Sequence, residues 1–192
     1  MDRLRSPGGC PWDAVQTHDS LRRYLLEETY EAYDALVDGD DVALREELGD
    51  VLLQVVFHAR LGQEADPPWS IDEVAGGLID KLVRRHPHVF ADRTVTGAAD
   101  VAANWEEIKK AEKGRTSVTD GLARSQPALA LAQALVRRTA RTGLPPPQAG
   151  GALGDRLLDL VVEAQEAGLD AEAELRAAAD RYAADLRTAE GV

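Results

Sequence analysis

Two pairs of acidic residues interrupt segments that otherwise have the apolar spacing of α-helices. Residues 21–36 read LRRYLLEETYEAYDAL and contain Glu28 and Glu31. Residues 44–58 read LREELGDVLLQVVFH and contain Glu47 and Asp50. Each pair is spaced i, i+3, so both carboxylates of a pair project from one face of a helix.

These carboxylates need a cation, and the sequence around them does not supply one. Ionised carboxylates at a helix interface are costly unless a positive charge meets them. Between Glu27 and Asp50 there are ten acidic residues, and Arg45 is the only basic one. The missing cation is most simply a metal ion.

The apolar positions around the two pairs predict how they meet. In the first segment the apolar stripe consists of Leu21, Leu25, Ala32 and Ala35, and in the second of Leu44, Leu48, Val51, Leu52 and Val55. Two antiparallel helices joined by a short turn would bring these stripes together and make the four acids converge on one pocket. Such an all-oxygen site suits Mg²⁺, with Mn²⁺ as a possible substitute. A di-iron site is the rival, but it uses Glu-x-x-His motifs, and none of the four histidines has an acid three residues before it.

A lone Mg²⁺ does little chemistry, so the acidic site implies a substrate that carries phosphate. The segment KLVRRHPH places Lys81 and Arg85 on one helix face, at spacing i, i+4. Further along, Lys109 follows Trp105 by four residues, which offers a ring for stacking beside a cation. The alternative for each is a solvated basic face with a tryptophan in the core. Together with the acidic cluster they favour a phosphate site.

Composition limits the classes of partner and location. The net charge is −12, from 22 basic and 34 acidic residues, which argues against a nucleic-acid polymer as partner because such partners need a basic surface. Cys10 is the only cysteine, so no disulfide framework is expected and a reducing compartment is favoured. No run of residues reaches the length of an apolar membrane span. We therefore expect a cytoplasmic protein without a membrane partner.

The expected fold class is all-α, because alternating β-branched runs bounded by hairpin turns are nearly absent. Capping residues and apolar periodicity predict helices at 17–37, 40–62, 70–86, 98–113, 127–142, 153–167 and 170–189. The segments RSPGGCPWD, near the start, and HPHVFADRTVTG, after the third helix, are expected to be irregular.

A faint internal repeat suggests two domains. The segment LGDRLLDLVVEA (153–164) matches LGDVLLQVVFHA (48–59) at most positions, and Asp155 stands where Asp50 stands. However, Ala152 replaces Glu47, and no Glu-x-x-Glu pair precedes it. We interpret residues 1–118 as a catalytic helical domain and 119–192 as a degenerate second copy. A chance match between two Ala- and Leu-rich amphipathic helices is the alternative.

Four blocks of sequence resemble one known family, the MazG-type nucleoside triphosphate pyrophosphohydrolases of the all-α NTP pyrophosphatase superfamily. The blocks are CPWDAVQTHDSLRRYLLEETYE, LREELGDVLLQVVFHA, DKLVRRHPHVF and NWEEIKKAEK, which occur in that order over residues 1–113. The family signature, Glu-x-x-Glu followed by Glu-x-x-Asp, falls on the two acidic pairs. The resemblance implies a four-helix-bundle-like MazG domain followed by a shortened, degenerate second repeat.

The resemblance also implies an activity, the hydrolysis of a nucleoside triphosphate to the monophosphate and pyrophosphate with Mg²⁺. It places the metal ligands at Glu28, Glu31, Glu47 and Asp50. It places the substrate contacts at Lys81, Arg85, Trp105 and Lys109. Members act as homodimers or larger homo-oligomers.

Several questions stay open at this stage. Glu27 or Glu46 would orient the attacking water, and the sequence does not choose between them. One alternative function is a non-catalytic regulatory or oligomerisation module. Another is a pyrophosphohydrolase with a narrow substrate, such as dUTP, phosphoribosyl-ATP or an oxidised nucleotide.

Overall fold

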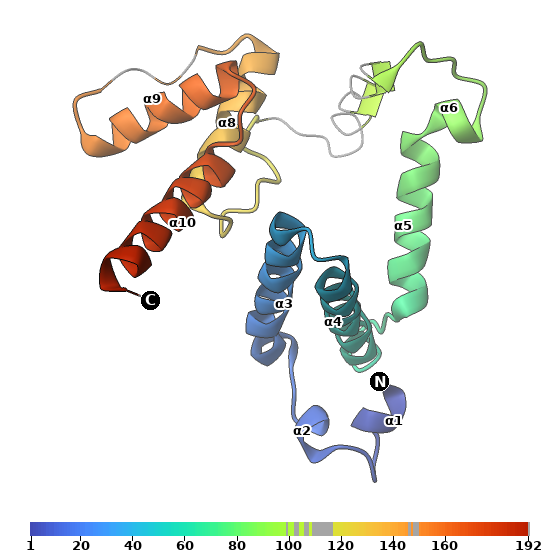
Figure 1. Ribbon diagram of the computed structural model, residues 1–192. Helices are drawn as coiled ribbons and strands as arrows, with labels where there is room; N and C mark the ends of the chain where they lie inside the picture. Colours follow the sequence, from blue (N-terminus) through green and yellow to red (C-terminus); the bar gives the residue numbers. More distant parts are fainter. Residues whose placement is uncertain are drawn as a thin grey trace. The chain divides into compact units, whose positions relative to one another are not determined.

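The protein is all-α, as the sequence predicts. The computed structural model describes residues 1–98, 100–101, 104–105, 108, 117–145, 147 and 150–191, and no strand occurs among these residues. The chain divides into two compact units, Met1–Glu106 and Glu107–Val192 (Figure 1). Within the described residues, no helix combines the length and the apolar character needed to cross a membrane.

A helical hairpin forms the centre of the first unit. Helix α3 spans His18–Asp38 and α4 spans Asp41–Gly62, and the two run side by side (Figure 1). Thr17 and Ser20 form a capping box at the start of α3. The turn is tight because Gly39 adopts a left-handed conformation, with φ of 68°, and the carboxylate of Asp40 then caps α4.

The apolar stripe expected on α4 is buried only in part, since Leu44, Val51 and Val55 are half-buried. Leu48 and Leu52 are exposed, at 54% and 59%. The half-buried or buried positions on α4 instead include Glu47, Asp50, Gln54, Phe57 and Leu61, which alternate at spacings of three and four. That heptad spacing is the one that keeps a seam against a neighbouring helix. The acids therefore occupy the seam itself, and the two leucines point away from it.

The apolar core of this unit lies at the other end of the same seam. Leu21 of α3 packs with Phe57 and Leu61 of α4, and Met1 and Tyr24 cover this cluster. The ring of Trp12 meets Phe57 edge-on, with the ring centroids 6.5 Å apart. The hairpin thus has an apolar end and an acidic end.

Three short helices occur that the sequence analysis did not predict, and two of them lie in segments expected to be irregular. They are α1 (Asp2–Arg5), α2 (Pro11–Ala14) and α6 (Pro87–Phe90). In α2 and α6 a proline takes the first helical position, where its fixed φ favours a helix and its missing N–H is not needed. Four-residue helices are too short to show a periodic pattern, so the sequence analysis missed them.

The N-terminal segment is held to the end of α4 by charged contacts. The guanidinium of Arg5 donates to both carboxylate oxygens of Glu64, at 2.8 and 2.9 Å, and Arg60 donates to Glu64 at 2.8 Å. The hydrogen bond from Arg5 is the main cause that lowers the pKa of Glu64 to about 2.

Helix α5 (Ile71–Arg85) follows a short connection and begins at a Ser70–Glu73 capping box, as predicted. The connection folds back on α4, because Trp69 lies against Gly62 and a Cβ at Gly62 would come within 2.4 Å of the indole ring. The predicted helix at 98–113 falls largely outside the described residues.

The second unit contains α8 (Ala128–Thr142), α9 (Leu153–Glu166) and α10 (Ala171–Glu190), close to the predicted ranges. Its small core is formed by Val136, Val161 and Ala171, one from each helix. The side chain of Gln133 joins the helices by accepting from the backbone N–H of Ala171 and donating to the carbonyl of Leu169.

Candidate metal and substrate site

Three of the four predicted metal ligands meet in the seam between α3 and α4. Glu28 of α3 and Glu47 and Asp50 of α4 each offer a carboxylate oxygen, and these oxygens all lie within 4.8 Å of one another. All three residues are half-buried. We call these three residues the carboxylate cluster. Within the described chain, this is the only group of three or more such side chains arranged closely enough to hold a metal ion.

Burial and mutual repulsion of the carboxylates dominate the electrostatics of the cluster. Burial raises the pKa of the Glu28 carboxyl, and the neighbouring carboxylates of Asp50, Glu31 and Glu47 raise it further. The pKa of Glu47 is raised for the same two reasons, desolvation first and then nearby acids. Glu28 and Glu47 are thus harder to ionise than isolated carboxyls, a condition that a bound divalent cation would relieve.

The other predicted acids lie around this cluster. Glu31 is exposed and is not among the three closest ligands, but its charge raises the pKa of both Glu28 and Glu47. Glu27 and Glu46 are also exposed, and each acts on one cluster member, Glu27 on Glu28 and Glu46 on Glu47. The charge of each of these three residues therefore raises the pKa of at least one residue of the carboxylate cluster.

The structure adds a residue that the sequence analysis did not consider. Gln54 follows Asp50 by four residues on the same face of α4, and only 5% of its surface is exposed. Its Oε1 atom is buried and has no hydrogen-bond partner in the described part of the chain. Its position in the seam, between the acids and Phe57, was the signal that could have revealed it.

Two histidines that lie forty residues apart in the sequence, one on α3 and one on α4, form a pair. The Nδ1 atoms of His18 and His58 are 2.7 Å apart. The ring planes are parallel within 4° and the centroids are 5.0 Å apart, so the rings meet edge to edge through these nitrogens rather than face to face. Burial, and to a smaller extent the neighbouring His18, lowers the pKa of His58.

Two of the four predicted substrate contacts, Arg85 and Trp105, lie together near the end of α5. Arg85 is buried, with 8% of its surface exposed, and its guanidinium lies over the ring of Trp105, 5.8 Å from the centroid. His86 meets the same ring edge-on at 4.8 Å. Lys81 is exposed. Lys109 lies outside the described residues. The structure therefore brings Arg85 and Trp105 together, and it adds His86, which the sequence analysis did not consider as a contact.

In the second unit Asp155, which aligns with Asp50 in the proposed internal repeat, has a local structural role. Asp155, the counterpart of Asp50, accepts a hydrogen bond from the backbone N–H of Ala152 at 3.2 Å and so caps the start of α9. The helix begins at Leu153, after the position that corresponds to Glu47, so there is no preceding turn to carry a second acid on this helix.

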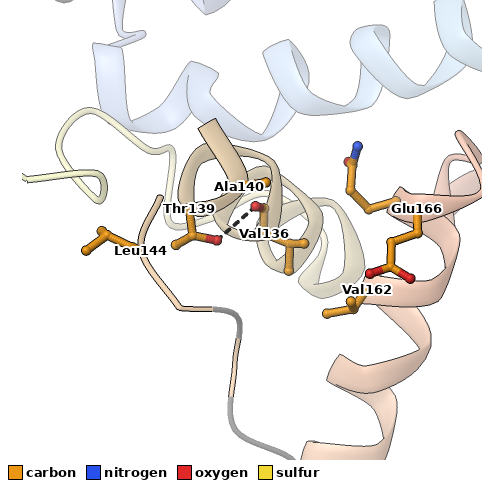
Figure 2. A pocket seen from close by; sticks show the side chains of 7 residues that line it. Val136, Thr139, Ala140, Leu144, Val162 and Glu166 are labelled. Carbon is orange, nitrogen blue, oxygen red and sulfur yellow. Dashed lines mark hydrogen bonds between the residues drawn. The ribbon is translucent and has the colours of Figure 1, made fainter. Parts of the chain in front are cut away.

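The second unit also has a mainly apolar cavity of about 380 Å³ between α8 and α9 (Figure 2). Val162 lines it and stands at the repeat position of Phe57, a larger side chain that fills the core of the first unit. Figure 2 shows Val136, Ala140 and Leu144 on the α8 side and Glu166 on the α9 side.

The fold and the site define an all-α protein with a cluster of carboxylates suited to a hard divalent cation. Residues 16–90 match the MazG nucleotide pyrophosphohydrolase domain, a range that includes both acidic pairs. An uncharacterised 26.1 kDa protein of Streptomyces cacaoi is 53% identical over all of this chain and 80% of its own length. The nucleoside triphosphate pyrophosphohydrolase of Mycobacterium tuberculosis is 47% identical over 99% of this chain.

The chain belongs to the MazG nucleotide pyrophosphohydrolase family. This confirms the predicted family, and the names of the relatives agree with the predicted class of enzyme. The nucleoside triphosphate pyrophosphohydrolase of Escherichia coli K12 is 46% identical over 74% of this chain. The chain spans just over half, 56%, of this relative and of the mycobacterial one. A solved MazG-related protein of Thermotoga maritima is 26% identical, with a TM-score of 0.46, over 55% of this chain and 91% of its own.

Proposed function

We propose that this chain is a Mg²⁺-dependent pyrophosphohydrolase that cleaves (d)NTP to (d)NMP and pyrophosphate and so removes unwanted nucleotides from the pool. The observation that carries the proposal is the carboxylate cluster, held in the helix seam inside the matched family domain. In the absence of a ligand, apolar residues in this seam would be more stable than three acids. The three acids therefore indicate that the active protein binds a cation here.

The residues present fit a hard cation. The donors are all carboxylate oxygens, which suit Mg²⁺ and Mn²⁺ better than softer metals. Glu28, Glu47 and Asp50 would hold the ion, and Glu31, one turn from Glu28 and close enough to raise its pKa, would complete the predicted set. When bound, the ion would polarise the triphosphate and neutralise charge on the leaving pyrophosphate.

The chain's own residues would orient the reactants. Either Glu27 or Glu46, both beside the cluster, would accept a hydrogen bond from the attacking water. The water adds to the α-phosphorus, the bond from that phosphorus to the α–β bridging oxygen breaks, and pyrophosphate leaves. Lys81 and Arg85 would bind phosphate oxygens, and Lys109 would assist them. Trp105 would stack beside these cations.

Exposed apolar side chains of the first unit support a homodimer or larger homo-oligomer. On α4 these are Leu48 and Leu52, and on α5 they include Ile79 and Leu82. A monomer rarely leaves so many large apolar side chains open. Sedimentation analysis tests this, because replacing both Leu48 and Leu52 with Glu should weaken self-association through α4. Val15→Glu, at an exposed position outside these helices, should not.

The decisive experiment is a pyrophosphate-release assay over canonical, deoxy and oxidised nucleoside triphosphates, with Mg²⁺, with Mn²⁺ and with chelator. Release from several triphosphates supports the proposal. Release from one triphosphate alone supports the narrow-specificity alternative. No release from any of them, with the protein folded, favours the non-catalytic module. A cytoplasmic location remains a prediction based on the lone Cys10.

A further inference from the structure

The chain turns at His86, between helices α5 and α6. Pro87 disfavours a helical conformation at the residue before it, so α5 ends at Arg85. The backbone N–H of His86 donates to the carbonyl of Leu82 at 3.0 Å, and Nδ1 of the His86 ring lies 2.7 Å from the same oxygen. Since a carbonyl oxygen only accepts, Nδ1 carries the hydrogen. Two hydrogen bonds therefore fix the imidazole of His86 to the last turn of α5.

This imidazole packs against the indole ring of Trp105. The two ring planes are 86° apart and the centroids are separated by 4.8 Å, which is the T-shaped arrangement that aromatic rings favour. The guanidinium of Arg85 lies over the same indole, 5.8 Å from its centroid. Trp105 is half-buried, and these two contacts restrict the rotation of its side chain. Because Arg85 is itself buried, a shift of the indole would also shift the guanidinium.

We propose that His86 is a positioning residue, which holds the indole of Trp105 in place and thereby keeps the guanidinium of Arg85 oriented toward the phosphate oxygens of the substrate. The inference rests on the proposed function, in which Arg85 binds phosphate. Without the ring of His86, Trp105 gains access to other rotamers, and a smaller fraction of the protein has Arg85 ready to bind. The affinity for the triphosphate then falls with that fraction, whereas turnover of the bound substrate hardly changes.

Two substitutions separate the ring of His86 from its hydrogen bond. His86→Asn keeps an N–H donor near the position of Nδ1 but removes the ring, whereas His86→Phe keeps a ring and removes the donor. We expect KM for pyrophosphate release to rise about three- to tenfold in His86→Asn, the change in population that one aromatic pair supports. Its kcat should stay within about twofold of wild type, and both constants should do so in His86→Phe.

Phe90→Asn is the matched control, because it removes an aromatic ring from an exposed position of α6. This variant should keep the KM of wild type. Urea unfolding verifies that all the variants are folded under the assay conditions.

Fluorine NMR of the full chain labelled with 5-fluorotryptophan follows Trp105 in the absence of substrate. The chain has three tryptophans, and Trp105→Phe identifies the resonance of Trp105 by removing it. In folded wild type, we expect this resonance to be displaced from its position in the urea-unfolded chain. It should move toward the unfolded position in His86→Asn and stay displaced in His86→Phe and Phe90→Asn.

An unchanged KM in His86→Asn, or an equal rise in His86→Phe or Phe90→Asn, would overturn the proposal. A fall in kcat without a rise in KM would also overturn it, since loss of folded protein or of a transition-state contact has that signature. If no nucleoside triphosphate is hydrolysed, the proposed function fails. The fluorine resonance then still tests whether His86 positions Trp105, so the two failures are distinguishable.

Discussion

Glu28 of α3 and Asp50 of α4 lie across the helix seam from each other, with carboxylate oxygens within 4.8 Å. After burial itself, the charge of Asp50 is the largest cause of the raised pKa of Glu28. Two like charges at a helix interface destabilise the metal-free hairpin. A divalent cation would convert the same contact into a stabilising one, and this reversal makes the metal site testable by stability as well as by activity.

The first prediction concerns Glu47. Glu47→Gln keeps the shape of the side chain but removes a ligand charge, so turnover should fall by about 100-fold or more. The metal-free variant should melt slightly higher than wild type, because one repulsion is relieved. Melting curves with and without Mg²⁺ measure both effects. Asp34→Asn, on the exposed surface of α3, is the matched control. If Mg²⁺ stabilises the Glu47 variant as much as wild type, Glu47 is not a ligand.

Asp155 and Asp50 should behave differently although they align in the proposed internal repeat. Asp155 caps α9 through the N–H of Ala152, so Asp155→Asn should cost about 1 kcal/mol of stability or less. Its turnover should stay within about threefold of wild type, because a helix cap stabilises the fold and does not bind the transition state. Asp50→Asn should nearly abolish pyrophosphate release. Comparable losses in both variants would show a working site in the second unit.

Lys81 and Arg85 are predicted to bind substrate rather than metal. Lys81→Ala and Arg85→Ala should each lower kcat/KM by an amount equal to about 2–4 kcal/mol of transition-state stabilisation. Mn²⁺ binding without nucleotide should barely change. Arg137→Ala, at an exposed position of α8 in the second unit, serves as control.

Since Arg85 is buried against Trp105, urea unfolding of its variant separates loss of packing from loss of binding. Ordinary solvated or bridging charges would contribute only about 0–1 kcal/mol. Near-normal kcat/KM in both alanine variants would therefore exclude these side chains from the substrate site.

The His18–His58 pair predicts a pH dependence of stability. The folded state lowers the pKa of His58 below its ordinary value of 6.5, so the unfolded chain binds more protons in this range. Stability should therefore fall as the pH drops from above 6.5 through the lowered pKa of His58. Urea midpoints measured between about pH 8 and pH 5 give this slope. The slope should shrink in His58→Gln and persist in His86→Gln, which changes a histidine outside the pair.

The ends of the main helices could be predicted because they depend on neighbouring residues. Thr17, Asp40 and Ser70 cap the helices that follow them through bonds within three residues, and Gly39 ends α3 by its own conformation. The acidic pairs were visible for the same reason, since i, i+3 spacing places both acids of a pair on one face wherever the helix lies. The sequence alone thus determined the all-α class, most helix boundaries and the candidate ligands.

Only the tertiary structure decided which face of each helix is buried. The periodicity of α4 permits either Leu48 and Leu52 or Gln54 and Phe57 to face α3, and packing selects the second set. Likewise, His18 meets His58, and Arg85 meets Trp105, across distances in the chain that no spacing rule spans. The physical reason is that helix rotation is set by the summed packing of both partners, which includes residues far apart in sequence.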